Sequence, residues 1–127
     1  MNNAAYQEII ERYIQAYNAF DIPKMTQYLH RDIVFENISN GVVTARTQGI
    51  EEFTAQAQAA TQYFRQRKQT AESFIFQEDT VIVSIDYKAI LAIDLPSGLR
   101  AGDVLELKGT SEFTFFNGSI IDIKDRS

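Results

Sequence analysis

The chain has 127 residues and a mass of 14.5 kDa, a size typical of one domain built around one hydrophobic core. Seventeen acidic residues against twelve lysines and arginines give a formal net charge of −5, which repels phosphate backbones and excludes a nucleic-acid partner on electrostatic grounds. The absence of cysteine excludes disulfides, thiolate metal sites and a cysteine nucleophile.

Apolar residues make up 45% of the chain but do not gather into long runs. No stretch approaches the ~20 residues needed to span a bilayer, so no membrane association is expected. Glu8, Glu11 and Arg12 interrupt the segment where a signal peptide would have its apolar core, and a cytoplasmic protein is therefore expected. We interpret residues 1–127 as a single domain.

Helical spacing dominates the first half of the chain. Asp21 can cap a short second helix that tolerates Pro23 in its first turn. A third helix is predicted to begin near Gly49 with an apolar face reaching Phe64, and the basic residues 65–68 are interpreted as its solvated C-terminus. The opening segment predicts an amphipathic helix, because it repeats apolar side chains every three or four positions: Tyr6, Ile9, Ile10, Tyr13, Ile14 and Tyr17.

The second half changes to the two-residue period of β-strands. Alternate residues from Val81 to Leu91 face one way and are apolar, while Asp86 and Lys88 face the other, so one face of the sheet is core. Helices followed by strands indicate the α+β class with an antiparallel sheet. Strands are expected at residues 33–37, 70–77, 80–93, 104–116 and 119–124, with a loop around residues 40–41 and a tight hairpin at residues 117–118.

Three segments resemble parts of the bacterial ketosteroid isomerases: residues 11–21 (ERYIQAYNAFD), 32–37 (DIVFEN) and 49–53 (GIEEF). The order of elements is similar to that of the SnoaL-like and nuclear-transport-factor-like proteins. The resemblance implies a cystatin-like fold, in which a cone-shaped, bent antiparallel sheet is wrapped around N-terminal helices. It does not choose a function, because the superfamily contains isomerases, polyketide cyclases, dehydratases, epoxide hydrolases and non-catalytic binding or dimerisation domains.

Ketosteroid isomerases use a helix tyrosine, a strand carboxylate and a protonated aspartic acid, and the resemblance places these positions at Tyr13, Asn37 and Ser111. In that chemistry the carboxylate moves a proton beside a carbonyl, while the other two groups hydrogen-bond the developing enolate oxygen. An amide cannot act as the base, so two of the three positions depart from the pattern. We therefore expect no ketosteroid isomerase activity of the known kind, although the three side chains can still hydrogen-bond a carbonyl or hydroxyl ligand.

Three other titratable residues are candidates for chemistry. Asp125 shares a strand face with core isoleucines and is expected near the pocket rim, where some relatives with cyclase activity place an acid, although fraying of the chain end equally favours solvent. The two-residue period places Glu36 on the outer face of the sheet. His30 is interpreted as a surface cap, and because no second histidine completes a site, neither a metal nor a cofactor is expected.

Two hypotheses about function follow. The first is a domain that binds a small apolar, oxygenated ligand, which is favoured because the strand carboxylate is missing. The alternative is a SnoaL-like isomerase, cyclase or dehydratase in which Tyr13 donates a hydrogen bond, Asn37 orients the substrate and Asp125 titrates. The mixed outer face of the sheet also indicates a homodimer, since relatives commonly dimerise through it. In both hypotheses the pocket is lined by Tyr17, Phe35, Phe53, Tyr87, Ser111, Phe113 and Phe115.

Overall fold

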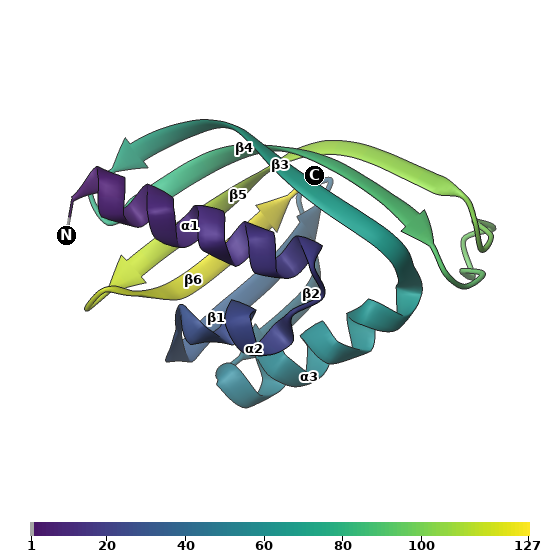
Figure 1. The fold of residues 1–127 in the computed structure, drawn as a ribbon, viewed down its shortest axis with the longest axis horizontal. Coiled ribbons are helices and arrows are strands. Elements are labelled where there is room, and N and C mark those ends of the chain that lie inside the picture. Colours follow the sequence, from purple (N-terminus) through teal and green to yellow (C-terminus); the bar gives the residue numbers. More distant parts are fainter. Residues whose placement is uncertain (1) are drawn as a thin grey trace.

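The computed structural model describes residues 2–127 and confirms the α+β class (Figure 1). Its strands form one bent sheet in the order β2-β1-β6-β5-β4-β3, and the helices lie along the inner side of the bend. No helix within this range is long and apolar enough to cross a bilayer. The elements are α1 (Asn3–Asn18), α2 (Ile22–Gln27), β1 (Leu29–Ser39), β2 (Val42–Gln48), α3 (Ile50–Ala60), the 3-10 turn η1 (Thr61–Tyr63), β3 (Phe64–Gln77), β4 (Thr80–Leu91), β5 (Val104–Phe116) and β6 (Ser119–Arg126).

Tight turns fix most of the sheet. At the predicted hairpin, Asn117 and Gly118 both have positive φ (50° and 82°), as a two-residue type I′ turn between antiparallel strands requires. Asn40 and Gly41 form a similar turn between β1 and β2. Neighbouring strands are antiparallel except β1 and β6, which run parallel. The sheet is therefore not wholly antiparallel. The parallel pairing is possible because a long stretch of chain, and not a hairpin, connects β1 to β6.

Two segments differ from the sequence-based prediction. The loop expected after β1 is instead a turn leading into β2, an edge strand whose mostly exposed residues lack clear alternation. The third helix ends at Ala60 rather than Phe64, and Phe64 already pairs with Leu91 of β4. The basic residues 65–68 consequently lie within β3 and not at a helix C-terminus. Because this segment is a strand, Arg67 lies on the concave side of the sheet, where it is almost fully buried.

The core lies between α1 and the concave face of β4, β5 and β6. Two aromatic contacts hold α1 there: the Tyr6 ring stacks on Phe115 with centroids 4.0 Å apart, and the Tyr13 ring meets Phe113 edge-on at 5.8 Å. The third helix packs instead against β1 and β2, where Phe53 meets Phe35 edge-on. Helix α2 begins as predicted, with the Asp21 carboxylate accepting from the Lys24 amide.

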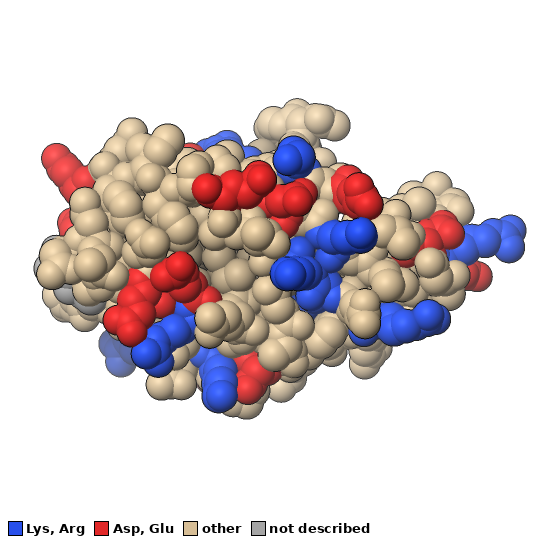
Figure 2. All heavy atoms as spheres, turned by 45° about the horizontal axis from the view of Figure 1, so that its top comes forward, with Lys and Arg blue, Asp and Glu red and all other residues tan. Residues whose placement is uncertain are grey.

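The convex face of the sheet carries several ion pairs. Glu36 lies there as predicted, since its register partners are Arg46 and Lys124 and its carboxylate is 3.4 Å from the Arg46 guanidinium. Exposed pairs between neighbouring strands also join Lys88 to Glu106 and Arg126 to Glu112. Figure 2 shows acidic and basic side chains interspersed over the face it presents. Exposed pairs of this kind contribute little to stability, about 0 to 1 kcal/mol each.

Candidate functional site

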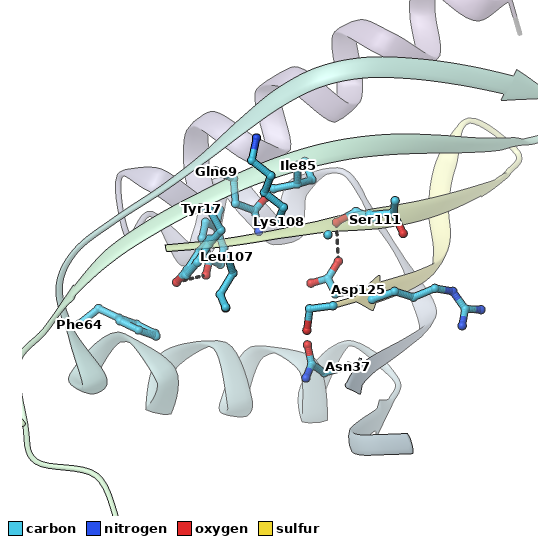
Figure 3. Close-up of a pocket in the computed structure, with 14 residues that line it drawn as sticks. Tyr17, Asn37, Phe64, Gln69, Ile85, Leu107, Lys108, Ser111 and Asp125 are labelled. Carbon is cyan, nitrogen blue, oxygen red and sulfur yellow. Dashed lines mark hydrogen bonds between the residues drawn. The ribbon is translucent and has the colours of Figure 1, made fainter. Parts of the chain in front are cut away.

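A two-lobed cavity lies where the helices leave the concave face uncovered. The helix lobe has a volume of about 410 Å³ and is bounded by α1, α3, η1 and the strands β1, β3 and β6. The strand lobe has a volume of about 260 Å³ and lies against β4, β5 and β6 (Figure 3). The helix lobe alone is within the size range of small-molecule sites. The two lobes share the lining residues Tyr17, Asn37, Phe64, Gln69 and Asp125.

Asp125 is the titratable carboxyl group of this cavity. The β6 register pairs it with Asn37 on one side and Ser111 on the other, which sets the three residues in one row across the concave face. The Ser111 hydroxyl donates to Asp125 Oδ1 at 2.7 Å (Figure 3). Burial raises the pKa of Asp125 to about 6, although the Ser111 hydrogen bond lowers it in part. Such a carboxyl group can take up and release a proton near neutral pH.

Two tyrosines of α1, one helical turn apart, face the same cavity. Burial raises the pKa of Tyr13, and the nearby Asp125 carboxylate raises it further. Burial also raises the pKa of Tyr17, whose hydroxyl lies 3.0 Å from that of Tyr87 on β4. Both phenols therefore stay protonated at physiological pH and are able to donate hydrogen bonds to a ligand oxygen.

Asn37 lies at the junction of the two lobes. Its Nδ2 donates to Thr44 Oγ1 at 2.9 Å, and that hydroxyl in turn donates to the Asn37 carbonyl at 3.2 Å. The pairing of β1 with β2 is irregular immediately afterwards, between Asn37 and Ile38. A β-bulge at this position bends the strand beside the cavity, and bulges are common next to functional sites.

The predicted aromatic lining divides into two groups. Phe35 and Phe53 line the helix lobe, while Tyr87 lines the strand lobe. Phe113 and Phe115, which were expected in the pocket, are not among the residues that line either lobe. Both side chains point to the concave face of β5, as Ser111 does, but α1 covers that part of the strand and buries both rings in the core.

Sequence reasoning missed Arg67 because its segment was assigned to a helix end. The guanidinium lies over the Tyr17 ring, 3.7 Å from the ring centroid, and 4.5 Å from the centroid of Phe20. Its Nε donates to the Tyr17 carbonyl at 2.9 Å, near the C-terminus of α1. Residues 65–71 are polar up to Ala71 and carry no alternating pattern that could have located it, and only the observed strand pairing puts Arg67 on the face of Gln69 and Ala71.

His30 lies away from the cavity, where its ring meets Phe116 edge-on and its Nδ1 accepts from the Asp32 amide at 3.0 Å. Across the described residues, no three or more histidine, aspartate or glutamate side chains are grouped so that they could hold a metal ion. The polar residues that line the two lobes include Asp125, the tyrosines, the hydroxyl residues Thr110 and Ser111, the amides Asn37, Gln56 and Gln69, and the cations Arg67, Lys108 and Arg126.

Comparisons with known proteins agree with this architecture. A family model described as the SnoaL-like domain matches residues 10–123. No curated protein matches the chain. Among solved structures, a candidate polyketide cyclase from Xanthomonas campestris pv. campestris is 17% identical with a TM-score of 0.86, covering 100% of this chain and 93% of its own.

Two further solved structures are similar. AclR, a candidate hydroxylase from Streptomyces galilaeus, is 16% identical with a TM-score of 0.77, covering 98% of this chain and 89% of its own. A nuclear-transport-factor-2-like protein of unknown function from Burkholderia pseudomallei is 15% identical with a TM-score of 0.77, covering 98% of this chain and 90% of its own. Identities this low carry information about fold alone.

Proposed function

This chain belongs to the SnoaL-like domain family, and from that premise we propose that its two-lobed cavity binds a small, largely apolar compound that carries ketone or hydroxyl oxygens. The aromatic lining of the helix lobe supports an apolar ligand body, and the phenols of Tyr13 and Tyr17 suit its oxygens. One similar structure is described as a candidate polyketide cyclase, and polyketides are oxygenated carbon chains of this kind.

We further propose that the protein is an acid/base enzyme in which Asp125 exchanges the proton. The observation that carries this proposal is a carboxyl group inside the cavity whose burial raises its pKa to about 6. As a carboxylate, Asp125 removes a proton from the carbon beside a ligand ketone, and the electron pair moves onto the carbonyl oxygen. The Tyr13 hydroxyl donates a hydrogen bond to that enolate oxygen, and the protonated Asp125 then returns the proton to carbon.

A non-catalytic binding domain is the second candidate, and one observation favours it. The position that holds the base in ketosteroid isomerases is Asn37, whose amide is engaged with Thr44 and cannot accept a proton from carbon. In this alternative the same cavity holds the ligand, and Asp125 only hydrogen-bonds it.

Deuterium exchange separates the two candidates. We expect the purified protein to bind 2-tetralone, a compact aromatic ketone, and to speed exchange of its α-protons in D₂O as followed by NMR. The Asp125→Asn variant should retain binding but lose about 10²-fold or more of the exchange rate. Saturable binding without faster exchange would favour the binding domain, whereas no binding of the ketone would contradict both candidates.

Ketosteroid isomerisation gives a separate prediction. The natural protein should show little or no conversion of a β,γ-unsaturated ketosteroid, because Asn37 occupies the base position. Asn37→Asp should gain measurable activity, and a further Tyr13→Phe change should remove it, since one oxyanion donor is typically worth about 10² to 10³ in rate. Turnover by the natural protein far above background would contradict this prediction and would mean that the proposed base, Asp125, also serves this reaction.

We also propose a homodimer formed through the convex face. Beside its ion pairs this face exposes apolar side chains, among them Ile75 of β3. Ile75 pairs with Ile82 of β4, and Ile82 pairs in turn with Glu112 of β5, so the three residues lie in one row across the convex face. Light scattering at tens of micromolar protein should give twice the chain mass of 14.5 kDa. A monomer mass at that concentration would refute the dimer.

A further inference from the structure

The strongest unused feature of the cavity is the buried cation at its α1 end. We propose that the Arg67 guanidinium binds a carboxylate of the ligand, so that the compound taken by the helix lobe is an aromatic or polycyclic carboxylic acid. This inference rests on the proposed function, since it names the chemical class of the ligand for the same cavity. It assigns Arg67 as a specificity residue and leaves proton transfer to Asp125.

The first support is an unsatisfied donor. Only 5% of Arg67 is exposed, and its Nη2 is buried without a hydrogen-bond partner among the residues that the structure describes. A buried donor without an acceptor costs the full desolvation penalty of that group, and the penalty is larger for a cationic group. A ligand oxygen that reached the guanidinium would remove this cost, and a carboxylate is the acceptor whose planar geometry matches the guanidinium fork.

The second support is the lack of a counter-charge. Within residues 2–127 no carboxylate forms an ion pair with Arg67, even though the chain carries a net charge of −5. The carboxyl group of the same cavity, Asp125, is hydrogen-bonded to Ser111 instead. The Arg67 charge nevertheless acts on the cavity, because it lowers the pKa of both Tyr13 and Tyr17 against the larger effect of burial.

A purely structural role explains only part of this arrangement. The stacking on Tyr17 and Phe20, and the Nε hydrogen bond to the Tyr17 carbonyl, fix the end of α1 against β3. These contacts use the ring-facing side of the guanidinium and one of its five N–H groups, and they leave Nη2 without an acceptor. The same contacts hold the guanidinium rigidly, which limits the entropy lost when a ligand binds.

The test uses two probes of equal size, naphthalene-2-carboxylate and naphthalene-2-carboxamide, with affinities measured by calorimetry at pH 7.5. The natural protein should prefer the carboxylate by about 10-fold or more, as expected for a charge-assisted hydrogen bond. Arg67→Met should lose this preference, because it weakens binding of the carboxylate much more than binding of the neutral carboxamide. Arg65→Met removes an exposed arginine from the same strand and is the matched control, which should keep the preference.

A preference that survives in Arg67→Met would overturn the inference. Equal affinity of the natural protein for both probes would also overturn it while leaving the proposed function intact, and failure to bind either probe would remove both. If Arg67→Met does not fold, the Arg67 Nε–H resonance of the natural protein decides the matter. It should shift on addition of the carboxylate and not of the carboxamide, and an unchanged resonance would refute binding of the carboxylate by Arg67.

Discussion

Replacing Asp125 by asparagine is expected to make the protein more stable than its natural form by about 2 to 3 kcal/mol at pH 8, and by less than about 1 kcal/mol at pH 4. The pKa of this group is about 6 in the folded protein against an ordinary value of 3.8, so the folded state binds its proton more tightly. The stabilisation from Asp125 is therefore present at low pH and is lost as the pH rises through this window. Urea unfolding of both proteins at pH 4, 5, 6, 7 and 8 measures the difference.

Ser111 provides a matched test of the same effect. Its hydroxyl hydrogen-bonds the carboxylate and lowers the pKa of Asp125, so Ser111→Ala should move the pH window upward. Parallel stability curves for the natural protein and Asp125→Asn from pH 4 to pH 8 would contradict the account, because they would mean that Asp125 titrates alike in the folded and unfolded chain.

Truncating Phe113 to alanine is expected to lower the free energy of unfolding by about 3 to 5 kcal/mol. Only 1% of this side chain is exposed, and its ring supports Tyr13 edge-on beneath the cavity. Phe116→Ala, three residues along the same strand, is the control. Because Phe116 is 53% exposed, its truncation should cost less than about 1 kcal/mol. Chemical denaturation followed by circular dichroism compares the two, and similar costs would contradict the placement of Phe113 in the core.

Periodicity predicted the parts of the fold in which burial is one-sided. Helix α1 and strand β4 present one apolar face each, so their character and their core faces could be predicted from the spacing of apolar residues. Strand β2 escaped prediction because, as an edge strand, it is mostly exposed and carries no alternating pattern. The end of α3 was misplaced because the alanines and glutamines before Phe64 suit a helix, whereas pairing with β4 begins at Phe64 itself.

The candidate site was predicted less completely, for a physical reason. Tyr13, Asn37, Ser111 and Asp125 could be selected by resemblance and strand parity, and β1, β5 and β6 bring the last three into one row. The raised pKa of Asp125 depends on how α1 and the sheet enclose the cavity, which no local pattern contains. Arg67 was missed for the related reason that a buried arginine and a solvated one look alike in a basic run.

A ¹³C NMR titration of the Asp125 carboxyl carbon measures whether this group exchanges its proton near neutral pH inside the ligand cavity. The spectra would be recorded from pH 3.5 to 8, with Asp125→Asn used to assign the resonance. We expect a midpoint near 6, well above the ordinary value of 3.8. A midpoint near 3.8 would mean that burial does not raise the pKa of Asp125, and the proposal that the cavity tunes this carboxyl group for proton exchange near neutral pH would then be contradicted.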